Sequence, residues 1–155
     1  MKKLVFVGLL FGMAMVAFGG GSVTYSKEAV TKEIVHKILS DKYNATRDDD
    51  GDTIIVNSGM KILVMANLKR EFVSFHWAAK ASGYSHSDKL ALCQKYNQEK
   101  VFVRFFLDKD DDYAADYQMA YDGGLNSDNL KGSVEWFCKV LEDFVKAAQE
   151  LKERE

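Results

Sequence analysis

Residues 101–107 read VFVRFFL, and residues 113–121 read YAADYQMAY. Both runs are rich in the aromatic and β-branched side chains that favour strands. The five residues between them, 108–112, read DKDDD, which is a polar connection too short for the crossover that parallel strands require. The two runs therefore predict an antiparallel hairpin, and with it an antiparallel sheet.

The chain before and after this hairpin supplies further strands and three helices. An Asp-Gly step joins two early strand-like runs, and Ser85 and Asp88 form a capping box ahead of a middle helix. Apolar residues at spacings of three and four predict a long final helix. The expected helices cover residues 27–39, 86–97 and 128–152, and the expected strands cover residues 43–47, 53–57, 61–68, 72–78, 101–107 and 113–121.

This order is α-β-β-β-β-α-β-β-α. Strands that come in groups, rather than alternating singly with helices, indicate an α+β fold. A chain of 155 residues fits one domain. We therefore predict a single domain over residues 27–155, in which helices pack on an antiparallel sheet of about five strands.

The first nineteen residues have the layout of a secretory signal peptide. Lys2 and Lys3 precede an uncharged apolar run over residues 4–18, and small residues follow it. The run of about 15 residues is shorter than the ~20 that span a bilayer, which favours cleavage over an uncleaved anchor. We expect a signal peptide over residues 1–19, a short linker over residues 20–26, and a periplasmic or secreted protein with no membrane association after cleavage.

Export would place the two cysteines, Cys93 and Cys138, in an oxidising compartment where disulfides persist. Each lies on or near the apolar side of an expected helix. A bridge between them would close a long loop and stabilise the fold by roughly 3–4 kcal/mol. Two separate buried thiols are the alternative, and the sequence leaves both readings open.

Several expected strands carry apolar side chains on both faces, whereas a sheet with one solvated face should alternate apolar and polar residues. Beyond the face that the first and last helices can cover, five residues form a candidate partner face: Leu63, Met65, Phe102, Arg104 and Phe106. The middle helix, a second copy of the chain, or a client polypeptide could cover this face. An exposed apolar patch of this size typically marks an interaction site.

The sequence offers no support for catalytic, metal or cofactor chemistry. The acidic turns around Gly51 and at residues 108–112 lack the glycine and glutamate spacing of a calcium-binding EF-hand loop. The three histidines, His36, His76 and His86, have no zinc-site spacing. The near balance of 21 basic and 23 acidic residues argues against nucleic-acid binding. We therefore expect no enzyme activity and no cofactor.

Several stretches resemble the YbjN family over roughly residues 27–148. Residues 96–100 (YNQEK) lead into residues 101–108 (VFVRFFLD), an acidic turn and a second strand follow, and residues 122–125 (DGGL) resemble the family's bend before its final helix. Asn129 and Leu130 follow the bend, and the phenylalanines from Phe137 to Phe144 resemble the spacing in that helix.

The resemblance implies a fold similar to type III secretion chaperones, often dimeric, and a role in sensory regulation without catalytic residues. The working hypothesis is an exported, non-enzymatic binding or regulatory protein whose partner is a protein, either a second copy in a homodimer or an exported client. A chaperone for an exported client is the nearest alternative. An uncharacterised periplasmic enzyme is the alternative of another class.

Overall fold

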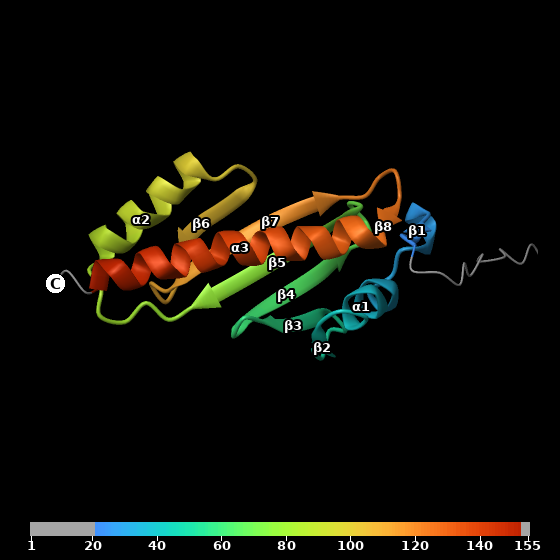
Figure 1. The fold of residues 1–155 in the computed structure, drawn as a ribbon, viewed down its shortest axis with the longest axis horizontal. Helices are drawn as coiled ribbons and strands as arrows, with labels where there is room; N and C mark the ends of the chain where they lie inside the picture. Colours follow the sequence, from blue (N-terminus) through green and yellow to red (C-terminus); the bar gives the residue numbers. More distant parts are fainter. Residues whose placement is uncertain (1–20, 153–155) are drawn as a thin grey trace, which may run out of the picture.

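A computed structural model of the chain describes residues 21–152 (Figure 1). Its helices are α1 (Lys32–Ser40), α2 (His86–Glu99) and α3 (Ser127–Lys152), with a short 3-10 turn at Lys27–Ala29. Its strands are β1 (Thr24–Tyr25), β2 (Asn44–Arg47), β3 (Thr53–Asn57), β4 (Met60–Asn67), β5 (Phe72–Ala79), β6 (Val103–Leu107), β7 (Tyr113–Ala120) and β8 (Leu125–Asn126). The predicted order of the main helices and strands is confirmed.

The main sheet is antiparallel throughout and has the strand order β2-β3-β4-β5-β7-β6. Hairpins join β2 to β5 in sequence order, and α2 then carries the chain to the far side, so that β6 forms the outer strand and β7 returns to pair with β5. All six of the predicted strands join this one sheet, which therefore has one strand more than the expected number of about five. The α+β class is confirmed.

The first helix begins later than the sequence pattern predicts. Ser26, the expected cap, makes no side-chain capping bond, and Val30 is extended and buried. Thr31 caps α1 instead, because its Oγ1 accepts a hydrogen bond from the N–H of Ile34 at 3.2 Å. A threonine at this position satisfies one of the free N–H groups that every helix start leaves.

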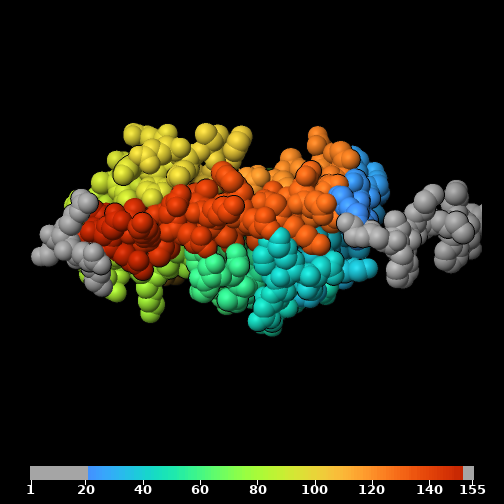
Figure 2. All heavy atoms as spheres, in the orientation of Figure 1, coloured from blue at the N-terminus to red at the C-terminus, as the bar shows by residue number. Residues whose placement is uncertain are grey.

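Helix α3 spans the sheet and carries the core (Figure 1). Phe137, Leu141 and Phe144 on this helix are fully buried, and Phe137 packs against Phe75 of β5 with ring centroids 6.1 Å apart. Burial of each such side chain is worth about 1.5–3 kcal/mol. Figure 2 shows α3 running across the molecule with α2 on one side and α1 on the other.

Helix α2 packs on the same face of the sheet as α3. Its Tyr96 ring lies 5.4 Å from the ring of Phe105 in β6 and 5.0 Å from that of Phe144 in α3. Phe105 and Phe144 are themselves stacked at 4.4 Å. The middle helix therefore does not cover the second face of the sheet, which was one of the readings that the sequence left open.

The chain before α1 also joins the fold. Strand β1 pairs antiparallel with β8, so Thr24 and Tyr25 are part of a small two-stranded sheet rather than of the linker expected over residues 20–26. Gly124 has φ +105, and a Cβ there would lie 2.6 Å from the Tyr25 carbonyl oxygen. The expected signal peptide, residues 1–19, lies outside the described residues.

No helix between residues 21 and 152 is long and apolar enough to cross a membrane.

The two cysteines are separate, buried, free thiols in the structure. Cys93 lies on α2 beside Tyr113, whereas Cys138 lies on α3 beside Tyr43 and Asn57. The disulfide considered from the sequence is therefore absent, because α2 and α3 direct the two thiols to different parts of the core. Burial raises the pKa of the Cys93 thiol to about 11, which keeps it protonated and unreactive at neutral pH.

A single side chain covers the middle of one edge of the sheet. At the β6–β7 turn, the Asp108 N–H donates to the Asp112 carbonyl, so these two residues form a hydrogen-bonded pair. Hydrogen-bonded and non-hydrogen-bonded pairs alternate along antiparallel strands. Phe105, three residues before Asp108, is therefore in a non-hydrogen-bonded pair and directs its N–H and C=O away from β7. Asn97 at the end of α2 meets both groups. Its Oδ1 accepts from the Phe105 N–H at 2.7 Å and its Nδ2 donates to the Phe105 carbonyl at 2.8 Å.

We predict that Asn97→Ala lowers the free energy of unfolding by about 2 kcal/mol, because two edge groups lose their partner. Alanine is the better helix former, so a loss cannot come from helix propensity. Chemical denaturation of the two proteins measures the difference. The exposed neighbour Gln98→Ala should stay within about 0.5 kcal/mol of wild type. An equal effect of both changes would contradict the role of Asn97.

Candidate functional site

The face of the sheet opposite the helices carries apolar side chains interspersed with polar ones. Along β3, β4, β5, β6 and β7 the side chains that point away from α3 are mostly half-buried or exposed, whereas those that point towards it are mostly buried. We call this surface the open face. Its members include Ile54, Val56, Lys61, Leu63, Met65, Asn67, Phe72, Ser74, His76, Arg104, Phe106, Asp116 and Gln118.

Three polar side chains cross the open face in one row of cross-strand neighbours. Leu63 pairs with His76, His76 with Asp116, and Asp116 with Arg104. The Asp116 carboxylate contacts His76 Nδ1 at 2.6 Å through one oxygen and accepts from Arg104 Nη2 at 2.6 Å through the other. The Arg104 guanidinium also lies over the Phe106 ring, 4.9 Å from its centroid.

This polar row is an internally paired set of charges among the apolar side chains of the open face. Both oxygens of Asp116 are engaged, one by His76 and one by Arg104, which fixes the carboxylate between the two strands. The face therefore has the chemistry of a contact surface: apolar area, with a fixed polar row that can orient a partner.

Four of the five residues predicted for the partner face lie together on the open face: Leu63, Met65, Arg104 and Phe106. Phe102 does not. Strand β6 begins at Val103, and Phe102 lies in the α2–β6 loop with φ +72 and 80% of its surface exposed. The predicted strand alternation is wrong at Phe102, because no glycine, proline or other turn residue at this position indicates that the strand begins only at Val103.

His76 and Asp116 also belong to the row, although the candidate partner face predicted from the sequence did not include them. Asp116 stands between Ala115 and Tyr117 in a strand whose helix-side residues are apolar. A charged residue at such an internal strand position needs a partner. The sequence therefore indicates that Asp116 has a partner. It does not give the strand register, which is what places His76 and Arg104 beside Asp116.

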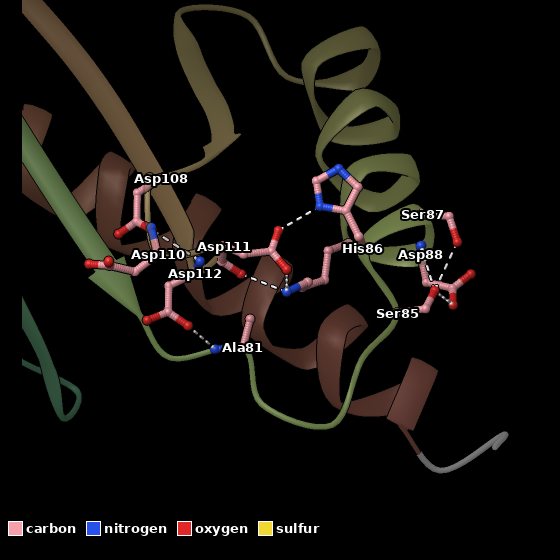
Figure 3. Close-up of polar contacts among 10 residues, drawn as sticks. Ala81, Ser85, His86, Ser87, Asp88, Asp108, Asp110, Asp111 and Asp112 are labelled. Atoms are coloured by element: carbon pink, nitrogen blue, oxygen red, sulfur yellow. Dashed lines mark hydrogen bonds and ion pairs between the residues drawn. The ribbon is translucent and has the colours of Figure 1, made fainter.

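The two acidic turns share one geometry and use their carboxylates internally. In the first, Asp48 Oδ1 accepts from the N–H groups of Asp50 at 3.1 Å and Asp52 at 2.8 Å. In the second, Asp108 Oδ1 accepts in the same way from Asp110 at 2.9 Å and Asp112 at 3.0 Å (Figure 3). Aspartate is favoured in such turns because its side chain bonds the backbone two residues on.

The second turn also anchors the start of α2 (Figure 3). Asp111, at φ +60, pairs with the almost fully buried ammonium group of Lys89 and contacts His86 Nδ1 at 2.6 Å. Lys89 also donates to the Asp111 carbonyl at 2.6 Å, and Asp112 accepts from the Ala81 N–H at 2.8 Å. The bonds from Lys89 and then His86 hold the pKa of Asp111 below its ordinary value.

Within residues 21–152, no group of three or more histidine, cysteine, aspartate or glutamate side chains is placed to hold a metal ion. The carboxylates of the acidic turns bond backbone N–H groups, Lys89 and His86. Their role in the structure is to shape hairpins and to fix α2.

We predict that Asp111→Asn destabilises the protein at neutral pH, because the buried Lys89 ammonium loses its counter-charge, and that the loss disappears in acid. Because the pKa of Asp111 is lower in the folded protein than its ordinary value of 3.8, the ionised carboxylate stabilises the fold at pH values above 3.8. This contribution is lost as the pH falls through the folded-state pKa. Asparagine tolerates positive φ, so the backbone is unchanged. Unfolding free energies of both proteins across this pH range test the sign. A difference that persists unchanged in acid would contradict it.

Comparison with known proteins supports the architecture described above. A family model described as "YbjN: Putative bacterial sensory transduction regulator" matches residues 32–150. Among solved structures, YbjN from E. coli superposes with a TM-score of 0.52 at 16% identity, covering 77% of this chain and 88% of that one. A comparison with curated proteins gives no match.

Two further solved structures share the fold. An uncharacterised protein from Methanothermobacter thermautotrophicus has a TM-score of 0.56 at 15% identity, covering 78% of this chain and 98% of its own. A chain of the HopA1–SchA chaperone–effector complex has a TM-score of 0.50 at 13% identity, covering 79% of this chain and 92% of its own. The fold is thus similar to that of a chain in this chaperone–effector complex. The match of the family model over residues 32–150 shows that the chain belongs to the YbjN family.

Proposed function

We propose that this protein is a non-enzymatic, regulatory or chaperone-like binder of a protein partner, and that the partner lies on the open face. The observation that carries the proposal is the uncovered second side of the sheet. Leu63, Met65 and Phe106 are half-buried there, and none of the helices within residues 21–152 lies above them. Apolar surface of this extent is costly to leave in water and typically marks an interaction site.

The polar row supports a polypeptide partner rather than a small molecule. The open face is a broad sheet surface, not a deep pocket, and small-molecule sites are typically concave. Arg104 is 71% exposed although it is bonded to Asp116. Its outer N–H groups can still meet backbone carbonyls or a carboxylate of a bound chain.

The family and one of its structural neighbours agree with this role. The family description is that of a sensory transduction regulator. The HopA1–SchA complex pairs a chaperone with an effector, and a chain of that complex shares this fold. These likenesses support protein binding without naming the partner.

The proposal also places the protein outside the cytoplasm, as an exported binder. Its support is the sequence pattern of Lys2 and Lys3 followed by the apolar run and small residues. An exported client polypeptide then becomes the nearest alternative to a regulatory partner, and both would use the same open face.

We predict that a photoreactive benzoylphenylalanine at Leu63 or at Phe106 cross-links one and the same partner in cells. Both positions share the open face although they lie on different strands. Mass spectrometry of the cross-linked band identifies the partner. Adding Met65→Asp to either variant should abolish the cross-link, because a charge would be buried against the partner.

Leu90 on α2 provides the matched control, since it is 41% exposed and lies away from the open face. The same probe at Leu90 should give no such band. Cross-linking of the same partner from Leu90, or its survival in the Met65→Asp background, would refute the open face as the site.

For export, we predict that the protein isolated from its natural host lacks residues 1–19 and fractionates with the periplasm or the medium. Mass measurement of the intact chain gives the N-terminus directly. An alanine-to-arginine change, Ala17→Arg, should block cleavage, because the cleavage site needs small residues. A chain that retains residues 1–19 in the soluble cytoplasm would contradict export and leave the open-face proposal untouched.

A further inference from the structure

The open face carries an excess of basic groups. Lys61 on β4 is exposed and forms no ion pair with any residue between 21 and 152. Arg104 on β6 is 71% exposed although it is bonded to Asp116. Among the residues that β3 to β7 place on this face, Asp116 is the only acidic one, and it is held between Arg104 and His76. The face is therefore positive, whereas the whole chain has a formal net charge of −2.

A further base extends this charge along the β4 side of the open face. Lys69 is exposed in the turn after β4, and it lines an open hollow of about 450 Å³ together with Met65 and Phe72. The acidic residue of this hollow, Asp52, is paired with Lys32 at 3.1 Å. Lys69 forms no ion pair within the described part of the chain. Unpaired bases therefore stand near both ends of β4.

The middle of the open face offers a partner side chains but no free main-chain groups. Strands β5 and β7 each have a hydrogen-bonded strand on both sides. A single extended segment lying on this surface would bury its own N–H and C=O groups without partners, which costs free energy for each group. An α-helix bonds these groups internally. A helix is therefore the single segment that suits this surface.

The spacing of the bases also matches a helix. Lys61 lies on β4 and Arg104 on β6, and β5 and β7 run between these two strands. Neighbouring strands lie about 4.8 Å apart, so the two flanks are about 14 Å apart. A helix with its side chains is about 10–12 Å across and fits between them. Acidic residues on both borders of its apolar stripe would meet the two bases, and the stripe would contact Leu63, Met65 and Phe106.

We propose that the partner of the open face is an acidic amphipathic helix, which lies along β5 and β7 and directs its carboxylates towards Lys61, Lys69 and Arg104. This inference rests on the proposed function, because it names the chemistry of the partner at the same site. Such charge complementarity speeds association and disfavours basic partners. Salt weakens it, because exposed charges are screened over about 8–10 Å at physiological ionic strength.

Cross-linking from Leu63 and Phe106 identifies the bound segment directly. Mass spectrometry of the digested partner locates the residue attached to each probe. The two attachment sites should lie within about two helical turns, roughly seven residues, of each other. The segment should carry apolar residues at spacings of three and four, with aspartate or glutamate on both borders. A shared segment without these acidic residues, or without helical spacing, overturns the inference and leaves the open face as the binding site.

Two matched double variants test the charge. Lys61→Glu with Lys69→Glu reverses both bases on the β4 side and breaks no ion pair. Lys139→Glu with Lys146→Glu makes the same change of net charge at exposed positions of α3. The first double variant should lower the yield of the Phe106 cross-link at least about tenfold, and the second should leave it unchanged. Arginine at both positions 61 and 69 should retain the wild-type yield.

A synthetic peptide provides the same test with purified protein. Strand β4 has eight residues, a length of about 27 Å that a helix of about 18 residues matches. The probe is a fluorescein-labelled peptide of this length, with leucines at spacings of three and four and glutamates on both borders. Its counterpart has lysine at every glutamate position. Fluorescence anisotropy measures the binding of each peptide.

The acidic peptide should bind at least about tenfold more tightly at low salt. The difference should shrink in about 0.5 M salt and vanish in the Lys61→Glu, Lys69→Glu protein. The net negative charge of the whole chain would by itself favour the basic peptide, so a preference for the acidic one reports the open face.

Equal binding of the two peptides, or tighter binding of the basic one, overturns the inference. An unchanged cross-link yield in the Lys61→Glu, Lys69→Glu protein does so as well. The absence of a common partner at Leu63 and Phe106 would instead refute the proposed function, and this inference with it.

Discussion

The burial of α3 is the constraint on which the rest of the structure depends. Its apolar stripe, which includes Phe137, Leu141 and Phe144, needs a full sheet face to cover it, and one face of six strands is what the chain supplies. Because α3 runs along the middle of that face, α1 and α2 find apolar surface only at its flanks, over β2 and β3 on one side and over β6 on the other. All three helices therefore pack on one side of the sheet, and no helix within residues 21–152 covers the second side.

The two acidic hairpins share one turn geometry, but only the second turn also holds a helix in place. Both turns use an aspartate that accepts backbone N–H groups, and both need one residue with positive φ, which is Gly51 in the first and Asp111 in the second. Glycine is the unstrained choice there. The second turn carries aspartate instead, and its carboxylate reaches Lys89 and His86 on α2. The positive φ of Asp111 thus carries a small conformational cost, and its carboxylate holds α2, the helix that covers β6, in place.

Local patterns in the sequence were sufficient for most of the fold. The number and order of the main-sheet strands, the two hairpins and α3 follow from period-two and period-3.6 spacing and from turn-forming residues, such as the Asp-Gly step of the first hairpin, all of which act within a few residues. The open face was partly predictable for the same reason, since Leu63, Met65 and Phe106 alternate with buried neighbours. What local patterns could not give was any feature set by tertiary contacts. The choice of face by α2, the role of Asn97 at the edge of β6, the His76–Asp116–Arg104 row and the break at Phe102 all depend on which distant segments meet.

The bond pair between Asn97 and Phe105 has a consequence for colloidal behaviour. An exposed strand edge is a template on which other chains can add and start aggregation. This sheet has its outer strands at β2 and β6, and the Asn97 amide occupies the main-chain groups of Phe105 that an added strand would need at β6. The mid-strand groups of β2 have no such guard: Ala45 and Arg47 direct theirs outward by the same alternation that governs Phe105. Strand addition at the middle of β6 would therefore have to displace the Asn97 amide, whereas addition at β2 would displace no such bond.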